Sequence, residues 1–299
     1  MRPGLLAVIL IVLWGLNWPA AFIALGSVPP LTFRVLTLAV GGATLMLFCM
    51  VNRISVRVRK RDFTRLISAS FLNVVAWNIL SVYAIVQLNS ARSAIVAFSM
   101  PFWTTIIEWL LGQSPTPSQR VAIAISSAGV AGLVLSASFD PTFSGIGAVV
   151  MSGAAFAWAC GSVYVKRRPV DMPSAAFTAW ALMLGAAMVA LFLPLQHESF
   201  FGSSLDWQAL TACLYATFIG IALCQACWFS LLGTLGPIGS SLVLLGIPPV
   251  GVASSWLLVG ATVSTLDIAS LVLLLLAAAT SLPAVQILVR RLTVGAGRY

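Results

Sequence analysis

Charge is scarce in this chain. Lys and Arg number 16, Asp and Glu number 7, and the four types make up 8% of 299 residues. A soluble domain carries about 25% charged residues, so these few charges could not cover a water-soluble protein of this length. Hydrophobic residues reach 60%, and the mean hydropathy is +1.05. The composition excludes a soluble or disordered protein and predicts an integral membrane protein.

Motifs for catalysis and for metal binding are also missing. The sequence has no HExxH, no GxSxG and no GxxxxGK[ST] pattern. Cys224 and Cys227 have the spacing of a redox or zinc motif, but there is no second pair and His197 is the single histidine. The net charge of +9 comes from short basic clusters beside apolar segments, which argues against nucleic-acid binding. We therefore expect no enzyme activity, cofactor, metal or nucleic-acid partner.

Apolar stretches of about 20 residues, the length of a transmembrane helix, are separated by charges and by Pro, Gly or Asn. Runs such as LVLLLLAAAT are apolar on every side, which excludes the alternating strands of a membrane barrel and leaves helices. We predict an all-α integral membrane protein with ten spans, at 4–25, 30–51, 64–87, 91–111, 118–137, 144–165, 173–194, 207–232, 237–258 and 265–289.

The positions of Lys and Arg predict the orientation of these spans. With a cytoplasmic amino terminus, fourteen of the sixteen basic residues lie inside, and only Arg34 and Arg92 lie outside. Basic residues concentrate on the cytoplasmic side of membrane proteins. Both termini are therefore expected in the cytoplasm.

An internal repeat appears when the chain is shifted on itself by 147 positions. The segment that begins at Ser90 then overlies the segment that begins at Pro237, and Pro101 meets Pro248. Trp109 meets Trp256 in the same register. The match pairs the fourth span with the ninth, so each repeat, 1–140 and 141–299, holds five helices. Successive units with an odd number of helices insert in opposite senses, which is the inverted repeat of many secondary transporters.

These features carry a family resemblance. Two units of five helices, the Trp14-Gly15-Leu16-Asn17 motif, the Ala157-Trp158 step and the two prolines resemble the EamA-type drug/metabolite transporter superfamily. The ten tryptophans and the polar residues of the third and fourth spans resemble its amino-acid exporter branch, in particular the aromatic amino-acid exporters called YddG. The resemblance implies export of small metabolites across the bacterial inner membrane. The first span lacks the membrane glutamate that couples the small four-helix multidrug relatives to protons.

Ionisable residues within spans are the first candidates for function, because a charge is costly in the membrane. Arg34 could extend to the interface or bind a substrate carboxylate. Glu108 lies near the cytoplasmic end of its span, where we expect it to reach the interface or pair with a neighbouring Arg.

Neutral polar and aromatic side chains supply the other candidates for a midplane site. We predict substrate contacts from Asn17, Asn78, Tyr83, Ser99, Trp103, Trp158, Trp180 and Arg34. Each could instead form a helix contact within the protein. Trp18, Trp109, Trp207 and Trp256 are expected in the interfacial belt. Pro101 and Pro248 are predicted to kink their helices and act as hinges, because proline removes a helical hydrogen bond.

The sequence thus favours a secondary transporter that exports amino acids or similar metabolites by alternating access, with a small molecule and membrane lipid as its partners. A monomer is slightly favoured over a dimer. A nucleotide-sugar or drug exporter of the same fold is the alternative within the class, and a membrane enzyme or passive channel is the alternative outside it.

Overall fold

The computed structural model describes residues 3–139, 143–196, 206–225, 227, 231 and 246–279, and these ranges contain helices and no strand. The first five-helix unit consists of α1 (Pro3–Leu25), α2 (Pro30–Val51), η1 (Lys60–Asp62), α3 (Phe63–Ser70), η2 (Phe71–Ala76), α4 (Trp77–Leu88), α5 (Ser90–Ala97), α6 (Met100–Leu110) and α7 (Pro117–Phe139). The second consists of α8 (Gly145–Arg167), α9 (Ser174–Ala190), η3 (Leu193–Gln196), α10 (Trp207–Leu214), η4 (Tyr215–Leu223), α12 (Ile247–Val259) and α13 (Thr265–Ala279).

These helices confirm the predicted membrane fold. Five helical stretches of the described chain are long and apolar enough to cross a bilayer, at 4–25, 30–51, 60–88, 90–110 and 145–167. Shorter apolar helices occupy Ser174–Ala190, Trp207–Leu223, Ile247–Val259 and Thr265–Ala277. The parts of the predicted spans at 237–245 and 280–289 fall outside the described residues.

Short polar side chains and prolines set where several helices begin. The Ser144 hydroxyl accepts a hydrogen bond from the Gly147 N–H, and the Asp206 carboxylate accepts one from the Ala209 N–H. Each satisfies a backbone donor that the first helical turn leaves free. Pro30 lies at the start of α2, where its missing N–H costs nothing. Local sequence therefore defines helix boundaries even in these apolar segments.

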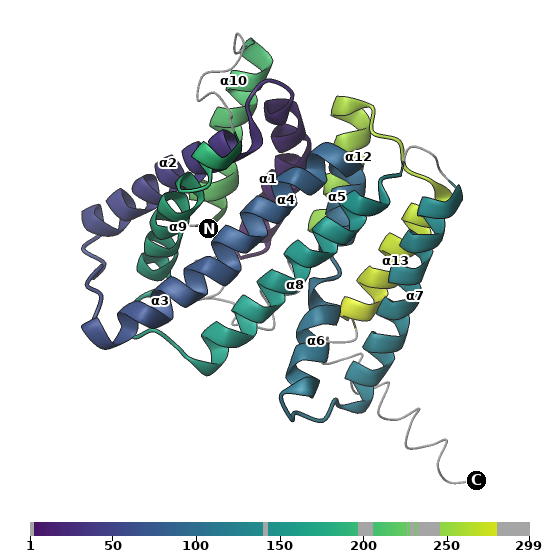
Figure 1. The fold of residues 1–299 in the computed structure, drawn as a ribbon, viewed down its shortest axis with the longest axis horizontal. Coiled ribbons are helices and arrows are strands. Elements are labelled where there is room, and N and C mark those ends of the chain that lie inside the picture. The colour runs from purple at the N-terminus through teal and green to yellow at the C-terminus, as the bar shows by residue number, and fades with distance from the viewer. Residues whose placement is uncertain are drawn as a thin grey trace.

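The packing of the helices shows the inverted repeat directly. α2 packs on α9 at one edge of the molecule, and α7 packs on α13 at the other (Figure 1). Between these edges, the first helix of each unit packs on the fourth helix of the other unit: α1 contacts α12, and α8 contacts α5 and α6. The first helix of each unit also packs on the third helix of the other: α8 contacts α4, and α1 contacts α10 and η4. Each contact is reproduced when the two units are exchanged, as a pseudo-two-fold axis in the membrane plane requires.

One local irregularity recurs in both units, and a second is seen in the first unit. η2 and η4 are π-helical segments, and each lies in the third helix of its unit. The fourth helix of the first unit is broken at Phe98 and Ser99, between α5 and α6. α12 begins one residue after Gly246, which lies 147 positions after Ser99. Since π-helical turns and helix breaks leave backbone groups without regular partners, both units place such groups in their central helices.

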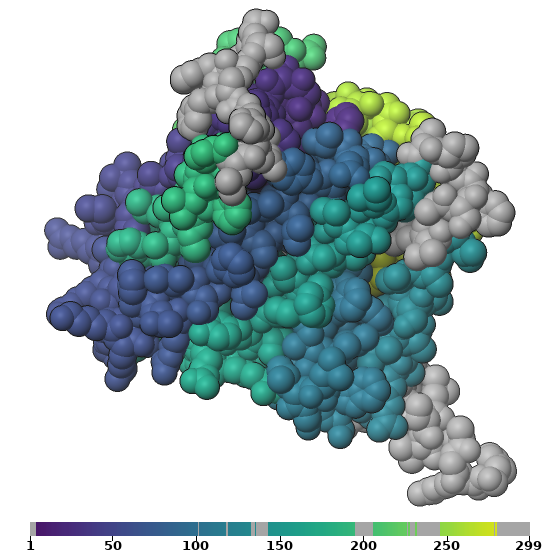
Figure 2. Space-filling model, viewed as in Figure 1, coloured from purple at the N-terminus to yellow at the C-terminus, as the bar shows by residue number. Residues whose placement is uncertain are grey.

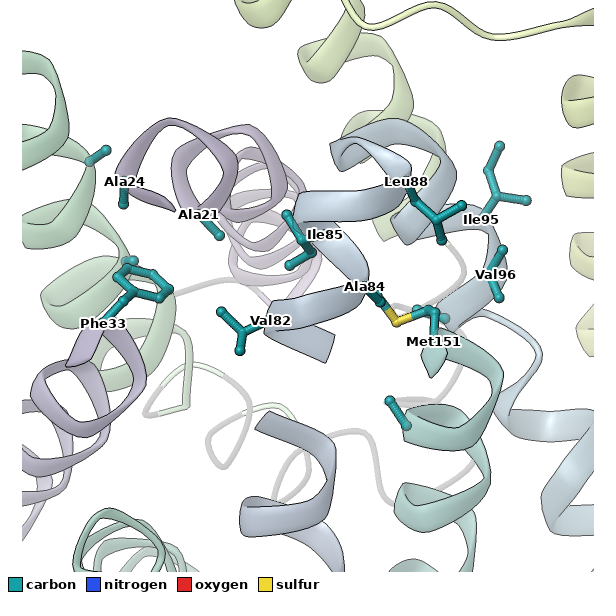
Figure 3. Packing of buried hydrophobic residues seen from close by; sticks show 14 of the residues in the cluster. Ala21, Ala24, Phe33, Val82, Ala84, Ile85, Leu88, Ile95, Val96 and Met151 are labelled. Atoms are coloured by element: carbon teal, nitrogen blue, oxygen red, sulfur yellow. The ribbon is translucent and has the colours of Figure 1, made fainter. Parts of the chain in front are cut away.

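The largest cluster of buried apolar residues joins the two units near the middle of the molecule. The space-filling view shows α4 and α8 side by side across one face (Figure 2). Beneath them, Ala21 of α1, Phe33 of α2 and Ile85 of α4 point into a common cluster, and Met151 of α8 meets Ala84 (Figure 3). Alanines let these helices approach closely, which is how membrane helices associate without help from water.

Candidate functional site

A small, partly open cavity lies among α1, α2 and the third helix of the first unit. Its volume is about 80 Å³, and it is lined by Asn17, Trp18, Ala21, Arg34, Trp77, Ser81 and Ile85. Ala21 and Ile85 belong to the central cluster of Figure 3. Asn17 and Arg34, two of the residues predicted for the site, thus come together although they lie on different helices. The cavity combines a charge, an amide, a hydroxyl and two indole rings.

Arg34 is held inside the protein. Its side chain is buried, and the guanidinium Nη2 donates to the Ser81 hydroxyl at 3.2 Å. The Phe33 ring centroid lies 5.2 Å from the guanidinium carbon, and Nε has no hydrogen-bond partner. Arg34 is thus buried and lines the cavity, and its contact with a substrate carboxylate stays a prediction.

Asn17 reaches the cavity because α1 is fixed against η4. The Trp14 indole donates to the Gly220 carbonyl at 2.8 Å, and the Tyr215 hydroxyl donates to the Leu13 carbonyl at 2.9 Å. The Asn17 amide occupies the notch left by Gly220, where any Cβ would collide with it. Its Oδ1 is buried without a partner. A π-helical segment thus positions the Trp14 to Asn17 motif.

Trp158 adjoins the cavity through a second indole. Its ring stands edge-on to the Trp77 ring, with centroids 5.4 Å apart. Trp77 lines the cavity itself, while Trp158 is 36% exposed. Edge-to-face pairs fix ring orientation, so these two residues form an aromatic wall shared by the two repeats.

Ser99 and Trp103 lie at the break between α5 and α6. Ser99 is buried as the residue preceding α6, and its hydroxyl has no partner. The Trp103 indole N–H is also buried without a partner, and its ring packs on Phe102 and Phe156. Neither of these two polar groups lines the cavity.

Asn78, Tyr83 and Trp180 also lie away from the cavity lining. The Asn78 side chain donates to the Val74 carbonyl of η2 at 2.8 Å, and Tyr83 packs against both larger apolar clusters. The Trp180 indole donates to the Val56 carbonyl at 2.8 Å and so ties α9 to the loop at 52–59. The structure therefore gives these side chains partners within the protein.

The prolines occupy the first turns of helices. Pro101 lies at the start of α6 and Pro248 at the start of α12. At Pro101 we expected a kink within a continuous helix, and the structure instead shows two helices, α5 and α6, separated by a break. Proline is favoured at a helix start because its fixed φ suits the first turn. Whether either residue acts as a hinge stays a prediction.

Trp18, Trp77 and Ser81 line the cavity but were not among the predicted contacts. Trp18 was expected in the interfacial belt and instead lies beside Asn17. Trp109, Trp207 and Trp256 are exposed, as the belt requires. Three of the lining residues, Trp77, Ser81 and Ile85, are spaced four residues apart and so share one helix face. This spacing would have identified Ser81 and Ile85 as lining residues if Trp77 had been assigned to the cavity.

Ion pairs gather at one end of the bundle, here named the basic end, which holds the 52–62 loop and residues 166–173. Glu108 pairs with Lys166 at 2.7 Å, and Asp171 pairs with Arg59. Glu108 thus has a basic partner near the end of its helix, and this partner is a Lys where an Arg was expected. In the described part of the chain no three His, Cys, Asp or Glu residues lie close enough to bind a metal.

Comparison with known proteins gives this arrangement its family. The pattern of the EamA-like transporter family matches the chain twice, at residues 2–135 and 145–282. The chain belongs to the EamA-like transporter family. It is a multi-pass membrane transporter, and the EamA repeat corresponds to the five-helix unit seen in the packing.

Similar EamA proteins cover most of the chain at low identity. An uncharacterized transporter of Bacillus subtilis, YvbV, is 29% identical over 78% of this chain and 76% of its own length. A probable amino-acid metabolite efflux pump of Salmonella typhimurium is 23% identical over 92% of each chain, and the pump of that name in Escherichia coli is 22% identical over 92% of each. A solved crystal structure matches 97% of this chain and 98% of its own, with a TM-score of 0.67 and 20% identity, which supports the fold.

Proposed function

We propose that this protein exports amino acids with apolar or aromatic side chains, or similar small metabolites, across the bacterial inner membrane. The observation that carries the proposal is the cavity beside Arg34, because it offers both polar groups and indole rings to a small molecule. The names of the Salmonella and Escherichia relatives support the same substrate class. We expect a protein with no enzyme activity and a monomeric assembly.

Alternating access is the proposed mechanism. Because the two units are related by a pseudo-two-fold axis, exchanging their conformations converts an inward-facing state into an outward-facing one. The helix break at Ser99 and the start of α12 lie at equivalent positions, and the fourth helix of each unit is proposed to bend there. Pro101 and Pro248 are the proposed hinges.

The basic end is proposed to face the cytoplasm. Arg53, Arg57, Arg59 and Arg61 gather there with Lys166, and basic residues are retained on the cytoplasmic side during insertion. The cavity then lies in the outer half of the membrane, since Arg34 is near the start of α2, at the opposite end. Substrate contacts are proposed for Asn17, Arg34 and Trp158, with Ser99 and Trp103 on the path.

Transport by purified protein in proteoliposomes tests the proposal. Radiolabelled amino acids, nucleotide sugars and cationic drugs are loaded in parallel, and efflux is compared with empty liposomes. We expect efflux of apolar and aromatic amino acids only. Efflux restricted to nucleotide sugars or drugs would replace the proposed substrate class, and conversion of a substrate to a product would indicate an enzyme.

Site variants refine the test. Trp103→Ala and Trp158→Ala should lower transport while expression and melting temperature stay near those of the parent protein. Substrate should also protect single cysteines introduced at 17 and 158 from a thiol reagent. Normal transport by both variants, or no protection at either position, would place the substrate elsewhere.

A further inference from the structure

The charge of Arg34 has no counterion among the described acids. Asp62 pairs with Arg65, Glu108 with Lys166 and Asp267 with Arg92. Asp171 pairs with Arg59 and Arg61, and Asp206 caps the start of α10. None of these acids lines the cavity. A buried charge without a partner is costly, so the cavity favours an occupant that brings a negative charge.

The guanidinium also has hydrogen-bonding capacity to spare. It carries five N–H donors and keeps its proton at any ordinary pH. Its Nε has no partner, and the described partner of Nη2 is the neutral Ser81 hydroxyl. A carboxylate is planar and can accept two parallel N–H bonds from a guanidinium. The missing acceptor is therefore of the carboxylate type.

An ammonium group finds much less in the same cavity. The lining includes no acid, and the Ser81 hydroxyl already contacts Arg34 and the Asn78 carbonyl. The Asn17 Oδ1 is the buried lining acceptor without a partner. An ammonium group in the cavity would lose its hydration and gain one neutral acceptor, and it would lie beside the like charge of Arg34. Ammonium binding is therefore disfavoured. A zwitterion thus gains at its carboxylate and gains little at its amino group.

The size of the cavity limits which part of a substrate enters it. About 80 Å³ is the space of two or three water molecules at ~30 Å³ each. A carboxylate and its α-carbon substituents need about that much room, whereas an aromatic side chain must extend beyond the cavity. The cavity therefore accommodates the head group of a larger molecule.

We infer that this cavity is a subsite for the substrate's carboxylate, held by Arg34, and that the α-ammonium group is dispensable. Monocarboxylic acids such as 2-hydroxy acids then bind at least as tightly as the amino acids with the same side chain. The inference rests on the proposed function and deepens it by naming the group that is recognised.

A series of three ligands with one side chain tests the inference by tryptophan fluorescence of the purified full-length protein. 3-Phenyllactate carries only the negative charge, phenylalanine carries both charges, and phenylalaninamide carries only the positive charge. We expect 3-phenyllactate to bind at least as tightly as phenylalanine, and phenylalaninamide to bind at least about tenfold more weakly, since a charge-assisted pair is lost. Equal binding of the amide, or no binding of any of the three, overturns the inference.

Variants identify the residue responsible. Arg34→Gln should weaken 3-phenyllactate at least about tenfold and leave the amide within about twofold. Arg57→Gln is the matched control, because Arg57 is exposed at the basic end, and it should bind like the parent protein. Unchanged binding of 3-phenyllactate by Arg34→Gln overturns the inference. If that variant does not fold, Arg34→Lys and the three ligands on the parent protein give the decision.

An inorganic anion is the competing source of negative charge, so sodium chloride is titrated alone. If chloride changes the tryptophan fluorescence at concentrations as low as those of 3-phenyllactate, the cavity is a general anion site and the inference is overturned. Flux in proteoliposomes separates the two proposals. Binding that depends on Arg34 without any flux would end the proposed export, whereas flux of phenylalanine and its amide alike, unaffected by Arg34→Gln, would end the carboxylate subsite.

Discussion

Arg92 and Asp267 form a buried ion pair between the two repeats. Nε of Arg92, at the start of α5, donates to Oδ2 of Asp267, at the start of α13, at 3.1 Å, and the side chains are 1% and 0% exposed. The Asp267 carboxylate also accepts from the Ser264 N–H, and the Phe143 ring lies 5.1 Å from the guanidinium carbon. The pair therefore joins the first repeat to the second at the end opposite the basic end.

Breaking this pair should destabilise the protein strongly. Asp267→Asn keeps an acceptor for Ser264 but leaves the Arg92 charge buried without its acid, which costs about 3–5 kcal/mol. The measurement is thermal unfolding in detergent. Arg92→Met combined with Asp267→Asn should recover much of the loss. Asp171→Asn is the control, because its pair with Arg59 is exposed and should contribute under about 1 kcal/mol. A melting temperature equally insensitive to both single changes would contradict the prediction.

Filling the notch at Gly161 should separate α8 from η2. A Cβ at this position would lie 2.5 to 2.7 Å from the Asn73 side chain. Gly161→Ala should therefore destabilise the protein by about 1–3 kcal/mol, and Asn73→Ala should relieve the collision. Gly145→Ala is the control, since nothing lies within 4 Å of its added Cβ. Equal melting temperatures for the two alanine variants would count against close packing here.

Replacing the prolines tests the proposed hinges. Pro101→Ala restores a backbone N–H at the start of α6 and lets the break at Phe98 and Ser99 close into a continuous helix. We expect a several-fold lower maximal transport rate with little change in the substrate concentration for half-maximal rate, and the same for Pro248→Ala. Pro30→Ala, at the ordinary start of α2, should transport normally. Undiminished transport in the double variant would remove the hinge role.

The bond from Trp180 to Val56 should hold the basic loop against α9. Trp180→Phe keeps an aromatic side chain but removes the indole N–H and its hydrogen bond, and loss of that bond costs about 1 kcal/mol. Trypsin should then cleave after Arg57 and Arg59 faster than in the parent protein, because the loop is released. Trp207→Phe, at an exposed ring, should leave the cleavage rate unchanged. If the two variants are cut equally fast, the bond does not restrain the loop.

Fusions at the termini test the orientation. Green fluorescent protein at either end should fluoresce, and alkaline phosphatase at either end should be inactive, because fourteen basic residues favour a cytoplasmic location for both termini. Active phosphatase at the carboxyl end alone would require an odd number of spans.

Sequence alone predicted the helices well, because apolar length and helix-breaking residues are local properties. It also selected Arg34 and Asn17, which line the cavity, since polar groups stand out against an apolar span; their contact with substrate stays a prediction. It missed Trp18 as a cavity residue, because the same indole suits an interface or a cavity and only its neighbours decide.

Partners far apart in the sequence were beyond reach. Arg92 and Asp267 are separated by 175 residues, so nothing in either local sequence indicates the pair. The π-helical segments η2 and η4 were equally hidden, because a uniformly apolar helix gives no periodic signal that an altered turn would disturb. Trp180 was selected as a substrate contact because its partner, a main-chain carbonyl in a distant loop, leaves no signal in the sequence.

The contacts of Asn17 with Gly220 and of Asn73 with Gly161 reveal how far the two halves have diverged. Asn17 and Gly161 each follow a tryptophan by three residues in the first helix of their unit, and Asn73 and Gly220 differ by the repeat length of 147. The amide and the glycine have therefore changed places between the halves.

An antiparallel homodimer of the first half would set Asn17 against Asn73 twice, with no notch to receive either amide. A homodimer of the second half would set glycine against glycine and leave two voids. At these two contacts neither half fits a copy of itself, so the packing of the first helix against the third depends on the unlike half.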